Sequence, residues 1–204
     1  MKMVEVIVTD RDGNIVKRIT VDEDLFNEYL KRKVERGLDP FTRWGLRLFR
    51  GVFHPVPTGG ANSESFTDTN GTSRTQYFKR PMAPTSATIP SLECFFNTGY
   101  CNNRLWVVVG TSNTPPTPND YKLGAKIGEA IASIGLVEEQ GTLTISGSLT
   151  FAEAKTIYEV GLEWEGVVAG YNTCGRVLVD RTVFPEGIAV GAGQTLTIVY
   201  RWIT

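Results

Sequence analysis

Hydrophobic and polar residues alternate with a period of two along several short stretches of the chain. In residues 141–151, leucine, isoleucine and phenylalanine positions fall on one face, and threonine and serine positions fall on the other. Residues 195–203 alternate in the same way, with leucine, isoleucine, tyrosine and tryptophan on one face. Strands with one apolar and one polar face are typical of antiparallel sheets.

Further apolar runs recur between turn signals through the second half of the chain. They are LECFF (92–96), RLWVVVG (104–110), TIYEVGLEWEGVVAG (156–170), GRVLVDRTVF (175–184) and GIAV (187–190). Many short strands separated by turns predict a mainly β protein with an antiparallel sandwich or barrel. Residues 125–134 are the one stretch here that a helix could also occupy, although Gly124 and Gly128 disfavour it.

The N-terminal part has a different pattern. Two β-rich segments, Val4–Val8 and Ile15–Val21, flank the sequence DRDGN, which is a strong hairpin signal. Apolar residues then recur at helical spacing, with acids at the start and bases near the end. Gly37 and Pro40 follow as stop signals. We therefore expect a small β-hairpin plus an α-helix over about Glu23–Arg36.

Composition divides the chain into three parts. Residues 58–90 are rich in serine, threonine, glycine, asparagine and proline and show no helical period, which is typical of a connector. One short strand is expected within it, at 75–78. The predicted domains are therefore a hairpin-helix element at 1–57, the connector at 58–90 and a β domain at 91–204.

Overall charge excludes little, because the 204 residues carry a net charge of −1. The 41% hydrophobic content argues against disorder of the whole chain, and no run is long enough to span a bilayer. The first residues, MKMVEVIVTDRDG, do not fit a secretory signal.

Basic residues are nevertheless concentrated between 31 and 50. The candidate partner contacts there are Lys31, Arg32, Arg43, Arg47 and Arg50. Together with neighbouring aromatic residues they could bind a membrane surface, nucleic acid or a protein. The alternative is a solvated helix face, followed by a core segment whose arginines extend to water.

Most patterns associated with catalysis or metals are missing from the sequence. The segment RLWVVVGTSNTPPTPNDYKLG (104–124) begins like a phosphate loop, but it lacks the lysine and second glycine and contains three prolines. The single histidine, His54, is expected to have a structural role, and the sequence contains no metal motif. Cys94 and Cys101 could pair across a hairpin and leave Cys174 free, or all three could be buried thiols.

Two further groups of residues leave alternatives open. Glu159, Glu163 and Glu165 alternate along one strand, so they could form the paired carboxylates of a glycosidase or the solvent side of a sheet. Four aromatic residues could form a sugar-stacking platform or belong to the core. They are Trp106, Trp164, Trp202 and Tyr200.

An ordered series of short motifs runs through residues 105–204. It comprises Gly110-Thr111, Pro115-Pro116, Asp120, Leu123, Ile157, Glu159, Gly161-Leu162, Arg181, Phe184 and the strand Leu196–Tyr200. The series resembles a module of bacteriophage and archaeal-virus structural proteins, of the tail-fibre, head-fibre, turret or capsid-decoration type. The resemblance covers about half of the chain, and residues 1–57 depart from it.

The resemblance implies a non-enzymatic virion component with a jelly-roll-like β-sandwich and no cofactor or catalytic residues. Its partners would be other virion proteins and further copies of the chain, with residues 1–57 as the attachment element. Contact with a host-surface glycan, and contact of the basic segment with nucleic acid or membrane, stay open. The alternative function is that of a carbohydrate-binding β-sandwich module.

Overall fold

The computed structural model of the chain describes residues 2–22, 62–78, 104–117, 120–137, 142–169 and 173–203. These residues form a mainly β structure with two larger antiparallel sheets and one separate hairpin, and they contain no helix. The helix expected over 23–36 lies outside the described residues. So do the basic residues Lys31, Arg32, Arg43, Arg47 and Arg50, together with His54, Cys94 and Cys101.

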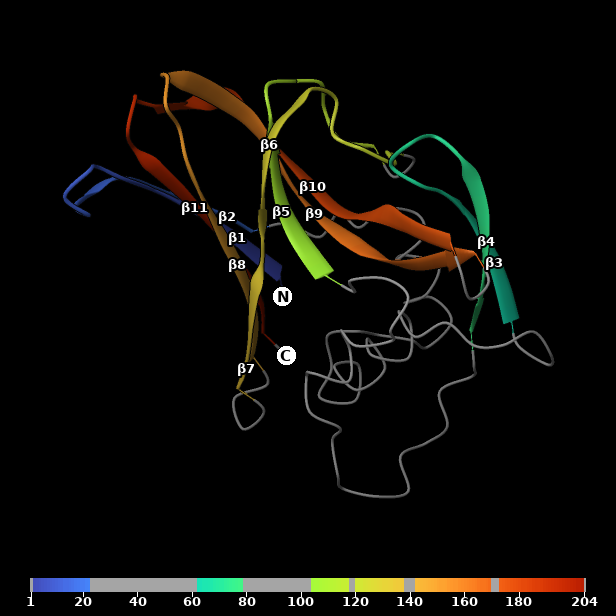
Figure 1. Ribbon diagram of the computed structural model, residues 1–204. Helices are drawn as coiled ribbons and strands as arrows, with labels where there is room; N and C mark the ends of the chain where they lie inside the picture. Colours follow the sequence, from blue (N-terminus) through green and yellow to red (C-terminus); the bar gives the residue numbers. More distant parts are fainter. Residues whose placement is uncertain are drawn as a thin grey trace.

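The five-stranded sheet has the order β2-β1-β11-β8-β7 (Figure 1). Its strands are β1 (Lys2–Thr9), β2 (Ile15–Asp22), β7 (Ser133–Val137), β8 (Thr142–Thr150) and β11 (Thr195–Ile203). The hairpin predicted from DRDGN is confirmed. Its first strand pairs along its whole length with the last strand, from Lys2 opposite Trp202 to Thr9 opposite Thr195.

The four-stranded sheet has the order β10-β9-β5-β6. Its strands are β5 (Arg104–Gly110), β6 (Lys126–Ile131), β9 (Lys155–Ala169) and β10 (Thr173–Val190). Strands β6 and β7 follow each other with only Ala132 between them, and they belong to different sheets. The helical alternative for 125–134 is therefore wrong, because this stretch hydrogen-bonds to neighbouring strands as extended chain.

One buried cluster contains side chains from both sheets. The five-stranded sheet contributes Val4, Val6, Val8, Ile145, Leu196, Ile198 and Tyr200, and the four-stranded sheet contributes Leu105, Val107, Val109, Val160, Leu162, Val179 and Ile188. Each such side chain contributes about 1.5–3 kcal/mol when fully buried. At Gly147 on β8 an added Cβ would lie 3.0 Å from side-chain atoms of Val107 on β5, so a glycine allows this close approach.

The separate hairpin consists of β3 (Asn62–Thr67) and β4 (Ser73–Phe78) and lies within the predicted connector (Figure 1). Its turn is held by Asp68, which is fully buried. The Asp68 carboxylate accepts hydrogen bonds from the backbone amides of Asn70 and Thr72 and from Arg74 Nε. The turn also touches the four-stranded sheet, because Thr69 N donates to the carbonyl of Arg176 at 3.0 Å. The division of the chain into three domains stays a prediction.

Candidate functional site

Strand β9 carries two groups of charged side chains on the face that points away from the shared core. Glu159 and Glu163 alternate along it with Val160 and Leu162, which belong to the core cluster. Both glutamates are nevertheless buried, at 0% and 1% exposure. The alternative that places these glutamates on the solvent side of a sheet is therefore wrong for both, because other segments of the chain cover them.

The Glu159 carboxylate is covered by the loop that follows β5. Its hydrogen-bond donors are Ser112 N at 3.3 Å, Gly124 N at 3.0 Å, Ala125 N at 2.7 Å and Arg181 Nε at 2.8 Å. A glycine at position 110 makes room for it, since an added Cβ would collide with Glu159 Oε1 and lie 2.6 Å from the carbonyl oxygen of Ala125. Backbone donors and one guanidinium thus compensate a carboxylate that is removed from water.

Arg181 extends this cluster to the middle of the loop. Its Nη1 donates to Asp120 Oδ2 at 2.7 Å, and its Nη2 donates to the carbonyl oxygen of Thr114 at 3.0 Å. Burial raises the pKa of Asp120, but hydrogen bonds from Thr117 and Arg181 outweigh that effect and lower it overall. We call Glu159, Arg181 and Asp120 the Glu159 cluster, and its contacts fasten the loop to the four-stranded sheet.

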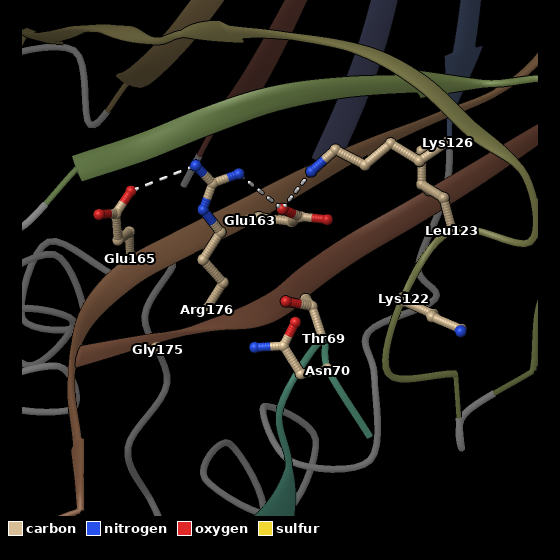
Figure 2. A pocket seen from close by; sticks show the side chains of 9 residues that line it. All are labelled: Thr69, Asn70, Lys122, Leu123, Lys126, Glu163, Glu165, Gly175 and Arg176. Atoms are coloured by element: carbon tan, nitrogen blue, oxygen red, sulfur yellow. Dashed lines mark hydrogen bonds and ion pairs between the residues drawn. The ribbon is translucent and has the colours of Figure 1, made fainter. Parts of the chain in front are cut away.

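The second group surrounds Glu163, four residues further along β9. Glu163 Oε2 lies 2.8 Å from Lys126 Nζ and 3.5 Å from Arg176 Nη1 (Figure 2). Glu129 Oε2 binds the same two cations, at 2.7 Å from Lys126 Nζ and 2.5 Å from Arg176 Nη1. Arg176 Nη2 reaches Glu165 Oε2 at 3.4 Å. We call these five residues the Glu163 cluster.

Trp106 on β5 supports the Glu163 cluster from one side. Its indole Nε1 donates to Glu165 Oε2 at 2.6 Å, and the Arg176 guanidinium lies 4.2 Å from the ring centroid. A guanidinium over a tryptophan face is a favourable cation–π arrangement. The hydrogen bond from Arg176, followed by the interactions with Lys126, holds the pKa of Glu129 at about 2, although burial opposes this.

A hollow of about 450 Å³ lies between the Glu163 cluster and the turn of the β3–β4 hairpin. Its lining side chains include Asn70, Lys122, Lys126, Glu163, Glu165 and Arg176. Figure 2 shows Lys126 and Arg176 converging on Glu163, with Thr69 and Asn70 of the turn below them. Within the described residues, no three histidine, cysteine, aspartate or glutamate side chains converge on a metal position.

The residues singled out in the sequence have different places in this arrangement. Glu159, Glu163 and Glu165 do lie on one strand, but each is engaged by cations or backbone donors. Tyr200 is fully buried in the core, as the alternative to a sugar-stacking platform predicts. The Arg176 guanidinium lies over the ring of Trp106. The side chains of Trp164 and Trp202 lie outside what the structure describes.

No pattern in the sequence indicated that Lys126, Glu129 and Arg176 would meet beside Glu163, or that Asn70 would lie next to them. Comparison of the chain with protein-family models, curated proteins and solved structures finds no match. In the described part of the chain, no helix has the length and hydropathy needed to cross a membrane.

Proposed function

We propose that the protein is a non-enzymatic structural component of a virus particle. In this proposal it is a jelly-roll-like β-sandwich that assembles with copies of itself and with other virion proteins. Within residues 1–57, the basic segment at 31–50 serves as the attachment element, whereas residues 2–22 form two strands of the five-stranded sheet. The two antiparallel sheets with a shared core support the sandwich part of this proposal.

The observation that carries the proposal is how the residues of the ordered motif series meet in space. Gly110 provides room for Glu159, which binds Arg181, which in turn binds Asp120. Leu123 completes this region, because an added Cβ at Gly161 would lie 2.9 Å from it. Part of the series thus forms one arrangement, a loop held against a sheet, and other members such as Ile157 and Phe184 lie in the core. This supports use of the series as a signature of a structural module.

The carboxylates support a non-enzymatic role. In glycosidases one carboxylate must attack the sugar or activate a water molecule while the other donates a proton. Glu159 is fully buried under the loop, and Glu163 and Glu165 are held by Arg176. These contacts leave the three glutamates suited to fixing structure rather than to reacting with a substrate.

Exposed apolar residues on edge strands support self-assembly. Among the described strands, β2 and β6 each lie at the edge of a sheet. Ile15 and Val16 on β2 are 55% and 57% exposed, and Ile127 and Ile131 on β6 are 44% and 53% exposed. Edge strands with apolar side chains are common sites of association.

Mass spectrometry of virus particles purified from the source organism tests the proposal. The chain should be present at high copy number, and its consistent absence from intact particles would overturn the virion role. Light scattering of the purified chain tests self-assembly separately. A monomer at every accessible concentration would remove that part of the proposal.

A carbohydrate-binding module is the second candidate function. The observation that favours it is the hollow beside the Glu163 cluster, which combines hydrogen-bond donors and acceptors within a volume of about 450 Å³. This volume falls in the range of about 300–1,000 Å³ that is typical of small-molecule sites.

A further inference from the structure

The hollow next to the Glu163 cluster has walls from separate parts of the chain. Strands β9 and β10 supply Glu163, Glu165 and Arg176, the segment before β6 supplies Lys122, and the β3–β4 turn supplies Asn70. Glu163 is almost completely buried, whereas Asn70 and Lys122 are exposed at the rim. The floor of the hollow therefore carries Glu163, Glu165, Lys126 and Arg176, and its rim carries Asn70 and Lys122. Figure 2 shows the Lys122 ammonium group directed away from Glu163, so this cation does not belong to the floor.

The turn that forms one wall is fixed in place before any ligand arrives. The backbone amide of Asn70 donates a hydrogen bond to Asp68 Oδ1 at 3.0 Å, and Thr69 N donates to the Arg176 carbonyl oxygen at 3.0 Å. The carboxylate of Asp68 has a lowered pKa, because hydrogen bonds from Thr72, Arg74 and Asn70 together outweigh its burial. A wall of this kind loses little conformational entropy on binding, which favours affinity.

The charges on the floor are already paired with one another. Lys126 lies within 2.8 Å of Glu163, and Arg176 contacts both Glu163 and Glu165. An added anion would approach the two carboxylates, and an added cation would approach Lys126 and Arg176. A zwitterion would have to break existing ion pairs to form its own. The floor therefore disfavours small charged ligands.

A neutral ligand with several hydroxyl groups matches such a floor. Each hydroxyl both donates and accepts, so it can bridge a carboxylate and a neighbouring ammonium group without separating them. A carboxylate has about four acceptor positions, and the two ion pairs of Glu163 both use Oε2. Asn70 can add one donor and one acceptor from the rim.

Trp106 takes no part in stacking on such a ligand. Arg176 lies over its ring, and its indole N–H is bonded to Glu165. Recognition in the hollow would therefore rest on hydrogen bonds rather than on an aromatic platform.

We propose that the hollow bounded by Asn70, Lys126, Glu163 and Arg176 binds a neutral saccharide through the hydroxyl groups of one or two sugar rings. This inference rests on the second candidate function and assigns it a site and a ligand class. It is independent of the proposed virion role.

The test is NMR titration of the full chain with free glucose, galactose, mannose, xylose and N-acetylglucosamine at millimolar concentrations. Glycine and sialic acid serve as charged probes. The side-chain amide of Asn70 and the indole N–H of Trp106 report on the hollow. Asn70→Ala and Glu163→Gln are the site variants. Asn113→Ala and Glu153→Gln are controls at exposed positions away from the lining.

At least one neutral sugar should shift the Asn70 amide in a saturable manner. Asn70→Ala should lower the affinity for that sugar about five- to tenfold, as expected for one lost hydrogen bond. Asn113→Ala should leave the affinity unchanged. Thermal unfolding first establishes whether Glu163→Gln is folded. If it is folded, its affinity for the sugar is compared with that of Glu153→Gln. If it is not folded, Asn70→Ala, at an exposed turn position, decides the test.

Three results would overturn the inference, and they differ in what else they remove. A sugar that binds equally well to wild type and to Asn70→Ala would refute this site but leave the carbohydrate-binding function. Absence of saturable binding by every neutral sugar would remove both. Tighter binding of glycine or sialic acid than of any neutral sugar would refute the ligand class.

Discussion

Glu159 and Glu163 lie four residues apart on the same strand, and both are buried carboxylates bound to an arginine, yet their surroundings differ. Glu159 is covered by the backbone of the loop after β5, which donates three amide hydrogen bonds to it. Glu163 is bound only by side chains in the contacts described above, and a hollow adjoins it. Whether a buried charge fixes the fold or remains available to a ligand is thus decided by what covers it.

The two clusters should also differ in energy. Removing one partner of a buried ion pair costs about 3–5 kcal/mol, because the other charge stays buried without compensation. Ion pairs near the surface contribute about 0–1 kcal/mol. Arg181 is 5% exposed and Arg176 is 24% exposed, so the Glu159 cluster should be the more important for stability.

The largest expected effect is that of Arg181→Met. It leaves Glu159 and Asp120 without their guanidinium, and we expect a loss of about 3–5 kcal/mol in the free energy of unfolding. Urea denaturation followed by circular dichroism measures it. The matched change Arg176→Met should cost less, because Lys126 still pairs with the buried Glu163 and Arg176 itself is 24% exposed. Equal losses in the two variants would contradict the distinction between the clusters.

The next effect is steric. Gly110→Ala places a methyl group against the Glu159 carboxylate and the Ala125 carbonyl, which should cost about 1–3 kcal/mol. The control is Gly135→Ala, where the nearest atoms to an added Cβ lie 3.9 Å away. Thermal unfolding of both variants compares them. A harmless Gly110→Ala would show that the loop can move away from Glu159.

A pH titration of Glu129 tests the Glu163 cluster. Because the folded-state pKa of Glu129 is lowered from 4.5 to about 2, its stabilising contribution is present above pH 4.5 and is lost as the pH falls towards 2. Arg176→Gln removes the main cause and should raise the pKa towards 4.5. Carbon-13 NMR of the Glu129 carboxyl group measures this change. An unchanged pKa would mean that Lys126 alone sets it.

The smallest expected effect is at the rim. Asn70→Ala should change the free energy of unfolding by less than about 0.5 kcal/mol, because Asp68 holds this residue through its backbone amide. Chemical denaturation measures this change. A loss of more than about 1 kcal/mol would show that the Asn70 side chain stabilises the turn, and it would weaken the case for a ligand role.

Local patterns predicted the strands because they depend only on neighbouring residues. The DRDGN hairpin and the alternating strands at 142–150 and 195–203 follow from turn chemistry and a period of two. The same alternation places Glu159, Glu163 and Glu165 on one face. The burial of the first two could not be predicted, because it depends on which segment covers that face.

The Glu163 cluster was beyond sequence analysis for a related reason. Lys126 lies at the start of a stretch that could also have been a helix, and Arg176 lies in an apolar run whose register against β9 cannot be read from the sequence. Their meeting with Glu163 requires the order β10-β9-β5-β6, which is set by pairing between distant segments. Nothing in 58–90 indicated that a turn with Asn70 would approach β10.

The pairing of β1 with β11 has a consequence for how the chain reaches its folded state. Figure 1 shows the two ends of the chain close together, and Val4 lies opposite Tyr200 in the middle of the five-stranded sheet. Contacts between residues so far apart in sequence slow folding, because a large loop must close before they form. During synthesis the β1–β2 hairpin is made long before β11. Its core valines, Val4, Val6 and Val8, therefore stay exposed until β11 can pair with β1. Slow refolding and a need for chaperones are the expected costs of this topology.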